Sequence, residues 1–316
     1  MELKMKSILK LLLVFLAIAQ YASASLPCPD FKESMLLNRN NSKLFDSLDS
    51  IYVELFEQMY TQNLQAANTD SSEEYRIPRI IHQIWLGSQV PEQYRNWMES
   101  WTSLEGWEYR LWTDREVAEL HLHNRELYDN SHNFGEKSDI LRLEILQQFG
   151  GVYADIDYEC LQPQMFEELH KKFDFYIGFE PLSMGSCRKF RIFKTCNAIL
   201  AAAPHHPLLH DLITNMKANY YAYIHFGVVE RTGPSYLTRI ICQHEMTGAH
   251  AKRNAYLPSS FFYPVSYRDR MNYQHHSKRI LQLFPEAAGV HFWEGSWRPT
   301  RSDYNTDLNC NEELYP

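Results

Sequence analysis

The stretch Gly150-Gly151-Val152-Tyr153-Ala154-Asp155-Ile156-Asp157 decides the fold of this 316-residue chain. Residues 138–148, just before it, predict a helix capped by Ser138, because four apolar side chains fall on one face: Ile140, Leu141, Ile145 and Leu146. The two glycines end that helix, and Val152 to Ala154 begin a short apolar strand. A helix that leads through two glycines into a buried strand favours an α/β layered domain.

Two carboxylates follow this strand, at Asp155 and Asp157. Side chains at i and i+2 of an extended segment point to the same side, so both carboxylates reach one spot at a sheet edge. Like charges held that close favour a bound cation, and oxygen ligands favour Mn²⁺ or Mg²⁺ over zinc. Such ions keep one or two protein carboxylates and take further oxygens from diphosphate and water. A pair of solvated acids in a turn is the alternative interpretation.

Other parts of the chain repeat this alternation of strands and helices. Short apolar or alternating runs predict strands at 80–86, 107–112, 175–179, 195–203 and 289–293. Helical spacing and N-terminal signals predict helices at 42–65, after Pro91, and at 114–121, 206–220 and 235–245. The alternation predicts one main α/β domain over residues 76–300, with a tail at 301–316.

The first residues have the features of a secretory leader. Three lysines precede an apolar run at 11–19, and Ala22-Ser23-Ala24 offers a cleavage site, so residues 1–24 are predicted to be removed. The apolar run is about half of the roughly 20 residues that a membrane span needs, so a retained type II anchor is less favoured and no stable span is expected. Residues 25–75 are interpreted as a helical appendage and linker. Six cysteines remain, an even number that permits disulfides in an exported chain.

Composition excludes several function classes. The formal net charge is −8 and no basic run occurs, which argues against a nucleic-acid partner. The chain has neither a phosphate loop of the G-x-x-x-x-G-K type nor a G-x-S-x-G nucleophile elbow.

Three ordered motifs together resemble a known family. Residues 77–87, 138–142 and 150–157 are similar to the D-x-D sugar-binding region of family 32 glycosyltransferases, which includes yeast-type mannosyltransferases and vertebrate galactosyltransferases. The glucosyltransferase domains of clostridial toxins are more distant relatives. The resemblance implies a GT-A fold, with a mixed central sheet flanked by helices. It also implies a UDP- or GDP-sugar donor, Mn²⁺ (or Mg²⁺), retention of configuration, and transfer of a hexose to the hydroxyl of a glycan, lipid or protein.

The resemblance also implies roles for particular residues. Asp155 would contact the ribose and sugar of the donor and reach the metal, and Asp157 would ligate the metal directly. Trp85 would stack on the nucleotide base. Asp139 and Arg142, which share a helix face, would hold donor-sugar hydroxyls, although Arg142 also suits diphosphate oxygens.

The segment 291–297 resembles the family's closing H-x-x-x-G-S-W motif. His291 is therefore a candidate metal ligand or diphosphate contact, and Ser296 and Trp297 are candidates for a flap over the diphosphate. Asn197 would face the donor sugar or the acceptor. Among the other histidines, His82 is interpreted as structural, and the pairs 205–206 and 275–276 as surface residues, because adjacent side chains point apart.

Two other functions remain open from the sequence. A metal-dependent phosphohydrolase would use the same carboxylates with a second ligand set. A catalytically silent carbohydrate- or metal-binding module would keep the metal site without turnover. For a transferase, the leaving diphosphate can deprotonate the acceptor, and Glu180 and Glu294 are candidate nucleophiles for a double displacement. An exported enzyme also needs a compartment supplied with sugar nucleotides, such as a secretory lumen.

Overall fold

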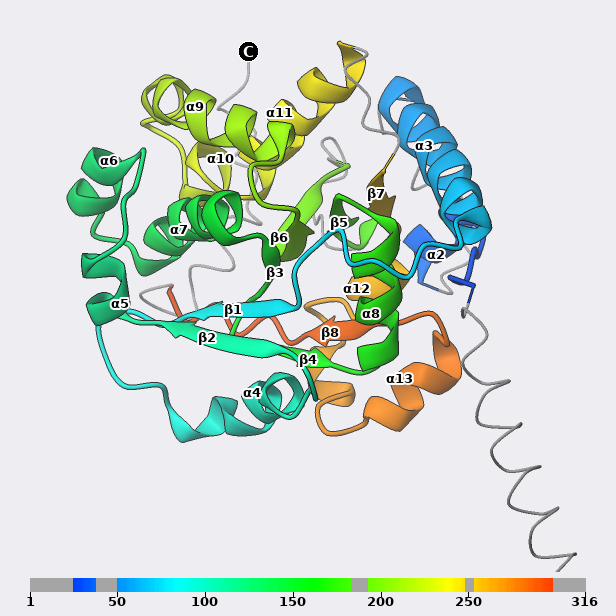
Figure 1. Ribbon diagram of the computed structural model, residues 1–316. Coiled ribbons are helices and arrows are strands. Elements are labelled where there is room, and N and C mark those ends of the chain that lie inside the picture. Colours follow the sequence, from blue (N-terminus) through cyan, green and yellow to red (C-terminus); the bar gives the residue numbers. More distant parts are fainter. Residues whose placement is uncertain (1–24, 38–49, 183–192, 248–252, 298–316) are drawn as a thin grey trace, which may run out of the picture.

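The computed structural model describes residues 25–37, 50–182, 193–247 and 253–297, and it is built around a central six-stranded sheet (Figure 1). The strand order is β2-β1-β3-β6-β5-β7. The strand bounds are β1 Ile80–Ile84, β2 Glu108–Trp112, β3 Gly151–Ala154, β5 Phe175–Phe179, β6 Thr195–Ala202 and β7 Asn254–Leu257. β1 is parallel to β2 and β3, whereas β6 is antiparallel to β3 and β5, so the sheet is mixed. The predicted α/β class, with a mixed central sheet as in a GT-A fold, is confirmed.

A second, two-stranded sheet places the C-terminal part of the chain beside the end of β3. It pairs β4 (Tyr158–Cys160) antiparallel with β8 (Gly289–His291), with Tyr158 opposite His291. Just before β4, the backbone N–H of Asp155 donates to the carbonyl of Ala198 on β6 at 2.8 Å. The segment that carries the two carboxylates therefore lies beyond the end of β3, next to β8.

Helices cover both faces of the sheet. α7 (Phe134–Phe149) and α11 (Pro234–Met246) pack on β6, and α9 (Pro207–Ala222) packs on both helices (Figure 1). The remaining helices have these bounds: η2 Glu92–Tyr94, α4 Arg95–Thr102, α5 Asp114–Ala118, α6 Arg125–Asn130, α8 Pro163–Lys172, α10 Val228–Arg231, α12 Ser259–Phe262, η4 Arg270–Asn272 and α13 Ser277–Leu283. The sequence analysis did not foresee β4, β7, α6 or α8.

The predicted N-cap of α7 was wrong. The helix begins at Phe134, and the side chain of Asn133 accepts from the N–H of Glu136 at 3.1 Å. The first turn carries polar residues at 136 and 137, so apolar periodicity alone placed the start one turn too late. Ser138 is therefore inside the helix, where its side chain is available for the site described below.

The N-terminal helices α2 (Phe31–Leu36) and α3 (Ser50–Thr69) share the core of the main domain. The ring of Phe56 on α3 lies 5.2 Å from that of Phe179 on β5 and 4.9 Å from that of Tyr256 on β7. The first part of the predicted helix at 42–65 falls outside the described residues, and so do the predicted leader at 1–24 and the tail at 301–316.

Within the described ranges, every helix is too short or too polar to cross a bilayer. Cys28, Cys160 and Cys196 carry free thiols. The prediction that His206 lies on the surface was wrong: its side chain is buried and caps α9, accepting from the N–H of Leu208 at 3.3 Å, while His205 is exposed. The two neighbours do point apart, but only one of them points to solvent.

Candidate active site

Three side chains that could hold a metal ion meet where β3 ends and β8 ends. Asp155, Asp157 and His291 each offer one ligand atom, and these atoms all lie within 4.8 Å of one another. The Nε2 atom of His291 lies 3.2 Å from Oδ1 of Asp157 and 3.7 Å from Oδ2 of Asp155. Within the described part of the chain, no other group of three or more such residues is this compact.

Backbone contacts hold the two carboxylates in place. The backbone N–H of Glu294 donates to Oδ2 of Asp157 at 2.7 Å, and the amide of Gln83 on β1 donates to the carbonyl of Asp155 at 3.1 Å. The N–H of Phe292 also donates to the carbonyl of Asp157 at 3.0 Å. Strands β1, β3 and β8 therefore fix the site together.

The electrostatics of this cluster follow from burial and opposite charge. Burial alone would lower the pKa of His291, but the carboxylates of Asp157 and Asp155 outweigh it and raise the pKa to about 10. Burial would raise the pKa of Asp157, but His291 and the N–H of Glu294 bring it below its usual value. The pKa of Asp155 is raised, chiefly by burial. In the absence of a cation, the imidazolium of His291 balances the negative charge of the carboxylates.

A second buried polar group lies next to the first, centred on Arg142 of α7. Its Nη1 lies 3.2 Å from Oδ1 of Asp155 and donates to the carbonyl of Asn197 at 2.5 Å. Its Nη2 lies 3.2 Å from Oδ1 of Asp139. The guanidinium therefore joins the two acidic positions that the sequence analysis assigned to metal and sugar.

Asp139 is almost fully engaged by protein groups. Its Oδ1 accepts from the amide of Asn197 at 2.7 Å, and its Oδ2 accepts from the hydroxyl of Thr232 at 2.9 Å. Burial raises the pKa of Asp139 to about 6, although Arg142 and these two donors act in the opposite direction. Because a carboxylate oxygen can accept two hydrogen bonds, Oδ2 retains capacity for one more donor.

Tyr153 connects the helix and strand that carry these groups. Its hydroxyl donates to Oδ1 of Asp155 at 2.6 Å and lies 3.1 Å from the hydroxyl of Ser138. The guanidinium of Arg142 lies over its ring, 4.5 Å from the centroid. Ser138, which the sequence suggested as a cap, thus orients Arg142 and Tyr153 instead.

The donor set of the first cluster fits a divalent cation. Two carboxylates supply oxygen ligands that suit Mn²⁺ or Mg²⁺, and the imidazole nitrogen favours Mn²⁺ of the two; the carboxylates are already held by hydrogen bonds to other atoms. His291 presents Nε2 to both carboxylates, while its Nδ1 is buried without a hydrogen-bond partner. A neutral imidazole that ligates through Nε2 would keep its proton on Nδ1, so the residues present fit the ion.

The other predicted donor contacts lie around this centre. The indole of Trp85 stands 5.3 Å from the ring of Tyr94, and Tyr94 in turn lies beside the Ser296 hydroxyl and near Asp157. Trp297 covers the start of α7: a Cβ placed on Gly135 would come 2.7 Å from its ring. The structure describes all of the predicted site residues: Trp85, Asp139, Arg142, Asp155, Asp157, Asn197, His291, Ser296 and Trp297.

The two candidate nucleophiles differ in their surroundings. The carboxylate of Glu180 is paired with Lys194 at 3.3 Å. Glu294 follows β8, and its backbone already contacts Asp157.

His82 agrees with the structural interpretation: its Nε2 lies 2.8 Å from the carbonyl of Gly150, and its Nδ1 accepts from the indole N–H of Trp112 at 3.1 Å.

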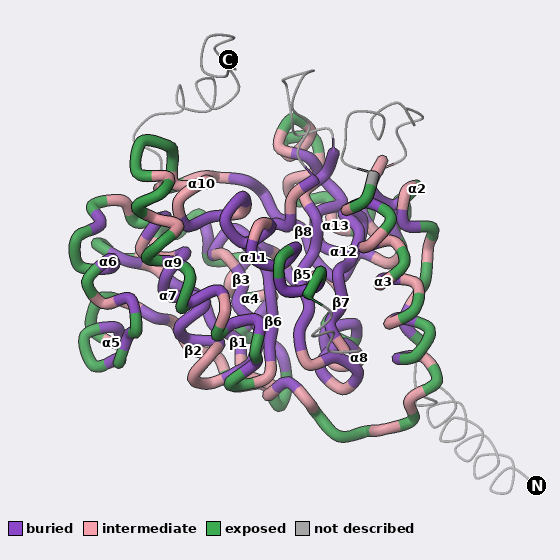
Figure 2. The backbone as a smooth tube through the Cα atoms, turned by 90° about the horizontal axis from the view of Figure 1, so that it is seen from above, coloured by how far each residue is buried: buried purple, intermediate pink, exposed green. Residues whose placement is uncertain are grey.

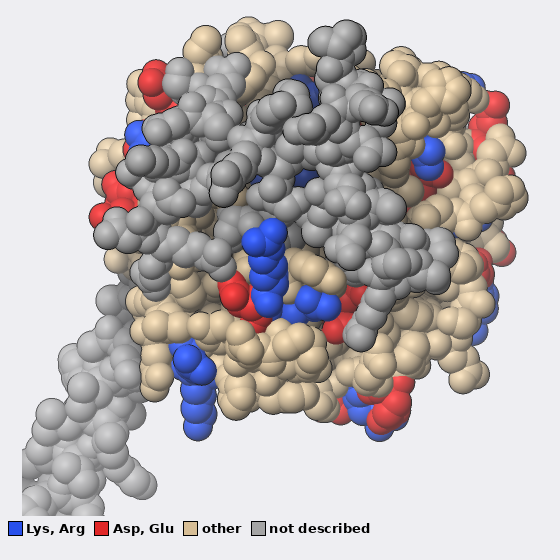
Figure 3. All heavy atoms as spheres, turned by 180° about the vertical axis from the view of Figure 1, so that it is seen from behind, with Lys and Arg blue, Asp and Glu red and all other residues tan. Residues whose placement is uncertain are grey.

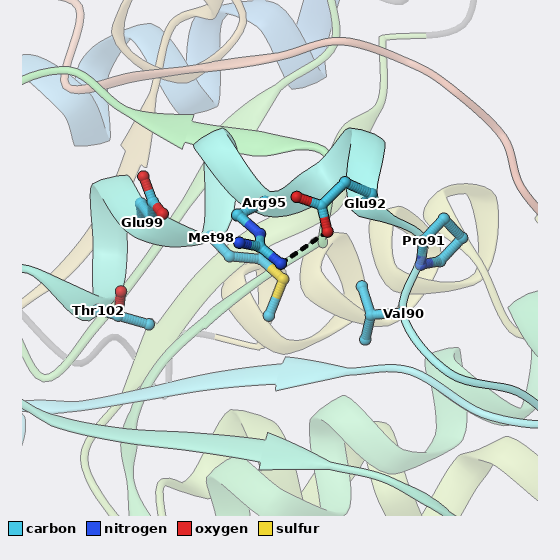
Figure 4. A pocket seen from close by; sticks show the side chains of 7 residues that line it. All are labelled: Val90, Pro91, Glu92, Arg95, Met98, Glu99 and Thr102. Carbon is cyan, nitrogen blue, oxygen red and sulfur yellow. Dashed lines mark hydrogen bonds and ion pairs between the residues drawn. The ribbon is translucent and has the colours of Figure 1, made fainter.

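A pocket of about 300 Å³ lies on the outer side of η2 and α4, where Glu92 and Arg95 pair at 2.7 Å (Figure 4). None of the predicted site residues lines it. On the face shown in Figure 3, basic and acidic side chains lie in small mixed groups, with no extended basic field among the described residues.

The sequence did not indicate Tyr153 as part of the site, and it gave Thr232 no definite role. The run Thr232-Gly233-Pro234 resembles positions of the family without a defined function, and Tyr153 lies inside the quoted strand. Period-two alternation could have found Tyr153, because it faces the same side as Asp155. The role of Thr232 became visible only in the tertiary structure, where it follows α10 and its hydroxyl donates to Asp139 on α7.

Two stretches of the chain match known families of proteins. Residues 88–175 match the glycosyltransferase sugar-binding region containing the DXD motif, and residues 201–309 match the α1,4-glycosyltransferase conserved region. Both descriptions are of glycosyltransferases, and both stretches contribute residues to the site. The resemblance to family 32 glycosyltransferases that the three sequence motifs predicted is confirmed over these two stretches.

Individual relatives are moderately similar. Inositol phosphoceramide mannosyltransferase 1 of Schizosaccharomyces pombe is 29% identical over 60% of this chain and 59% of its own length. Human α-1,4-N-acetylglucosaminyltransferase is 27% identical over 56% of this chain and 48% of its own. The solved PaToxG glycosyltransferase aligns over 84% of this chain and 94% of its own, at 17% identity and a TM-score of 0.41. The chain thus spans about half the length of these curated relatives.

Proposed function

We propose that this protein is a metal-dependent, retaining hexosyltransferase that moves a sugar from a UDP- or GDP-sugar to an acceptor hydroxyl. The observation that carries the proposal is the convergence of Asp155, Asp157 and His291 beside the buried Arg142. A cation site and a fixed guanidinium next to each other suit a ligand that carries both a diphosphate and a sugar.

Asp157 and His291 would hold Mn²⁺ or Mg²⁺, with Asp155 reaching it directly or through water. The ion would neutralise the charge that develops on the departing nucleoside diphosphate. Arg142 would keep the Asp155 carboxylate aimed at the donor, because its Nη1 lies 3.2 Å from Oδ1. Tyr153 would do the same, because its hydroxyl donates to the same Oδ1 atom.

Asp139 and Asn197 would contact the donor sugar. The remaining acceptor capacity of Asp139 Oδ2 suits one sugar hydroxyl, whose orientation differs between hexoses. Trp85 would stack on the base, and Ser296 and Trp297 would close over the diphosphate. Thr232 would orient Asp139 without touching the donor.

For the acceptor we propose a lipid-linked hydroxyl, rather than a free glycan or a protein. Support comes from the printed name of the yeast relative, an inositol phosphoceramide mannosyltransferase. Retention would proceed with the leaving diphosphate as the base for the acceptor hydroxyl. Of the candidate nucleophiles for a double displacement, Glu294 is better situated than the ion-paired Glu180.

Export into a secretory lumen that is supplied with sugar nucleotides completes the proposal. It is supported by the leader-like residues 1–24 of the sequence.

Donor turnover tests the proposal. The purified chain is incubated with a panel of UDP- and GDP-sugars, with Mn²⁺ or with EDTA, and free nucleoside diphosphate is followed with and without a lipid-linked acceptor. We expect metal-dependent release from one donor, and its loss in Asp157→Asn. Hydrolysis of simple phosphate esters at the same site would favour the phosphohydrolase. Binding of nucleotide and Mn²⁺ without turnover on any acceptor would favour the silent module.

A further inference from the structure

The end of α9 and the loop before α10 expose an unusual group of apolar side chains. Tyr221 is 53% exposed, Ile224 40% and Phe226 43%, all within six consecutive residues. Figure 2 shows exposed chain beside α10. Single exposed apolar residues are ordinary on soluble proteins, but a contiguous group marks a surface that meets a partner. We call Tyr221, Ile224 and Phe226 the aromatic loop.

The aromatic loop is a built structure. The N–H of Phe226 donates to the carbonyl of Tyr223 at 2.9 Å, closing a turn, and the two rings lie 5.4 Å apart. The guanidinium of Arg239 lies 4.1 Å from the ring centroid of Tyr223. The amide of Asn219 donates to the carbonyl of Arg231 at 2.6 Å. The contacts of Tyr223, Arg239 and Asn219 hold the turn in place, and Phe226 packs one side of its ring on Tyr223 while it stays 43% exposed.

The charge around the aromatic loop differs from that of the whole chain. The net charge of the protein is −8, yet residues 212–229 contain no Asp or Glu and include Lys217 and His225. Of the nearby acids, Glu136 is paired with Arg231 at 2.8 Å and Glu126 with Lys217 at 2.6 Å. The carboxylate of Glu230 lies just beyond the loop, 3.4 Å from the position of a Cβ on Gly227. The charge around the aromatic loop is therefore close to balanced, so apolar contact rather than charge would dominate its binding to a lipid surface.

The aromatic loop is also tied to the candidate active site. Arg231 donates to the carbonyl of Phe226 at 3.0 Å and to Oε1 of Glu136, in the first turn of α7, at 2.8 Å. The next residue, Thr232, donates to Asp139 at 2.9 Å. A molecule resting on the loop would thus lie next to the start of α7, where Trp297 covers Gly135.

We propose that the aromatic loop is a lipid-docking surface, which inserts its Tyr, Ile and Phe side chains among the headgroups and upper acyl chains of a membrane. Tyrosine and phenylalanine rings beside basic groups match the chemistry of the membrane interface. The inference rests on the proposed function only in its consequence: a surface-bound enzyme would meet the hydroxyl of a lipid acceptor close to its site. A protein partner is the competing occupant.

Vesicle co-sedimentation of the full chain tests the proposal. The probes are phosphatidylcholine vesicles with and without phosphatidylinositol. We expect wild-type protein to sediment with both kinds, because the charge around the loop is close to balanced. The triple variant Tyr221→Ser/Ile224→Ser/Phe226→Ser should bind at least about tenfold more weakly. The matched control is Met271→Ser, which removes a 61% exposed apolar side chain from η4 and should bind like wild type.

Two single variants that place opposite charges at residue 224 test whether the sign of the charge affects binding to the vesicles, without a large loss of apolar area. Ile224→Lys should retain binding to the anionic vesicles, whereas Ile224→Glu should lose it. Thermal melts of each variant report folding, and donor hydrolysis, measured without acceptor, should stay at the wild-type rate in all of them. Wild type that ignores vesicles, or a triple variant that sediments like wild type, overturns the proposal and points to a protein partner.

The two proposals fail separately. Vesicle binding without any donor hydrolysis would contradict the transferase activity and leave the docking surface standing. Donor hydrolysis without vesicle binding would contradict the docking surface and leave the transferase activity standing.

Discussion

Nε2 of His291 lies 3.2 Å from Oδ1 of Asp157, although His291 ends β8 and Asp157 lies far away in the chain, in the turn before β4. The antiparallel pairing of β4 with β8 sets this distance, because Tyr158 and His291 are partners in its register. A metal site at this point therefore depends on the docking of the C-terminal strand.

Removal of either ligand should weaken the binding of Mn²⁺. We expect Asp157→Asn and His291→Gln each to lose at least about 100-fold in Mn²⁺ affinity, measured by electron paramagnetic resonance of free Mn²⁺. Donor turnover should fall in parallel. The control is Glu105→Gln, which neutralises an exposed acid remote in sequence from the cluster. Wild-type Mn²⁺ affinity in both ligand variants would contradict the assignment.

Arg142→Lys should damage both stability and activity. Lysine keeps the charge but cannot reach Asp155, Asp139 and the carbonyl of Asn197 at once, as the fork of Arg142 does. Breaking a buried ion pair in this way should cost about 3 kcal/mol in the free energy of unfolding, measured by urea denaturation. Donor turnover should fall even at low temperature, where the variant is folded. A Lys variant as stable as wild type would show that the ion pairs of Arg142 with Asp139 and Asp155 are solvated.

Thr232→Val tests how Asp139 is oriented. Valine has nearly the same shape but removes the hydroxyl that donates to Oδ2, which should cost about 1–3 kcal/mol in stability. The KM for the donor should rise more than kcat falls, because the carboxylate that would meet the sugar loses its orientation. Thr232→Ser, which keeps the hydroxyl, should restore both values. Equal kinetics in the Val and Ser variants would remove Thr232 from the site.

Gly135→Ala separates the candidate flap from the helix beneath it. A Cβ at this position would come 2.7 Å from the ring of Trp297 and 3.0 Å from the side chain of Asn133. Alanine favours a helix by up to about 1 kcal/mol, so the free energy of unfolding should change little. The KM for the donor should rise several-fold as Trp297 is displaced, with a change in tryptophan fluorescence. A donor KM equal to that of wild type would argue against a flap at Trp297.

Two buried neutral histidines should lose their contribution to stability in mild acid. Burial lowers the pKa of His82 to about 4 and that of His170 to about 3, against 6.5 for the free side chain. At these two residues the unfolded chain takes up protons first as the pH falls below 6.5, so their contribution to stability decreases down to about pH 4. Asp139, whose pKa is raised to about 6, acts in the opposite direction, so the histidine contribution is measured as a difference in slope between wild type and a variant. His82 alone should account for about 3 kcal/mol of this loss.

Urea denaturation between pH 7 and pH 4 measures that slope. In His82→Gln the free energy of unfolding should be lower at pH 7 but should fall less steeply with acid. The exposed His121→Gln is the matched control and should keep the wild-type slope. An unchanged slope in His82→Gln would show that His82 is not the buried neutral group.

Local patterns predicted the elements that carry the site better than those that support it. The runs around Ile80, Phe175 and Thr195 are short and β-branched or aromatic, and each forms a strand of the large sheet. β7 has the sequence Asn-Ala-Tyr-Leu, which lacks a run of β-formers and takes its conformation from pairing with β5. His206 was placed on the surface because sequence spacing shows that neighbours diverge but not which of them meets the core.

The sequence by itself determined the class of this protein, because the D-x-D pair, the helix before it and the first strand lie within local, ordered motifs. The expected extended segment at the two carboxylates was wrong: the strand ends at Ala154, and the chain turns there, with the N–H of Tyr158 donating to the carbonyl of Asp155 at 3.0 Å. The tertiary structure alone decided what surrounds that pair. The β4–β8 pairing brings His291 to the carboxylates, the packing of α7 on β6 brings Arg142 to Asp155, and α10 brings Thr232 to Asp139. These contacts join residues that are distant along the chain. They form only when burial of the shared core offsets the entropy of bringing those segments together.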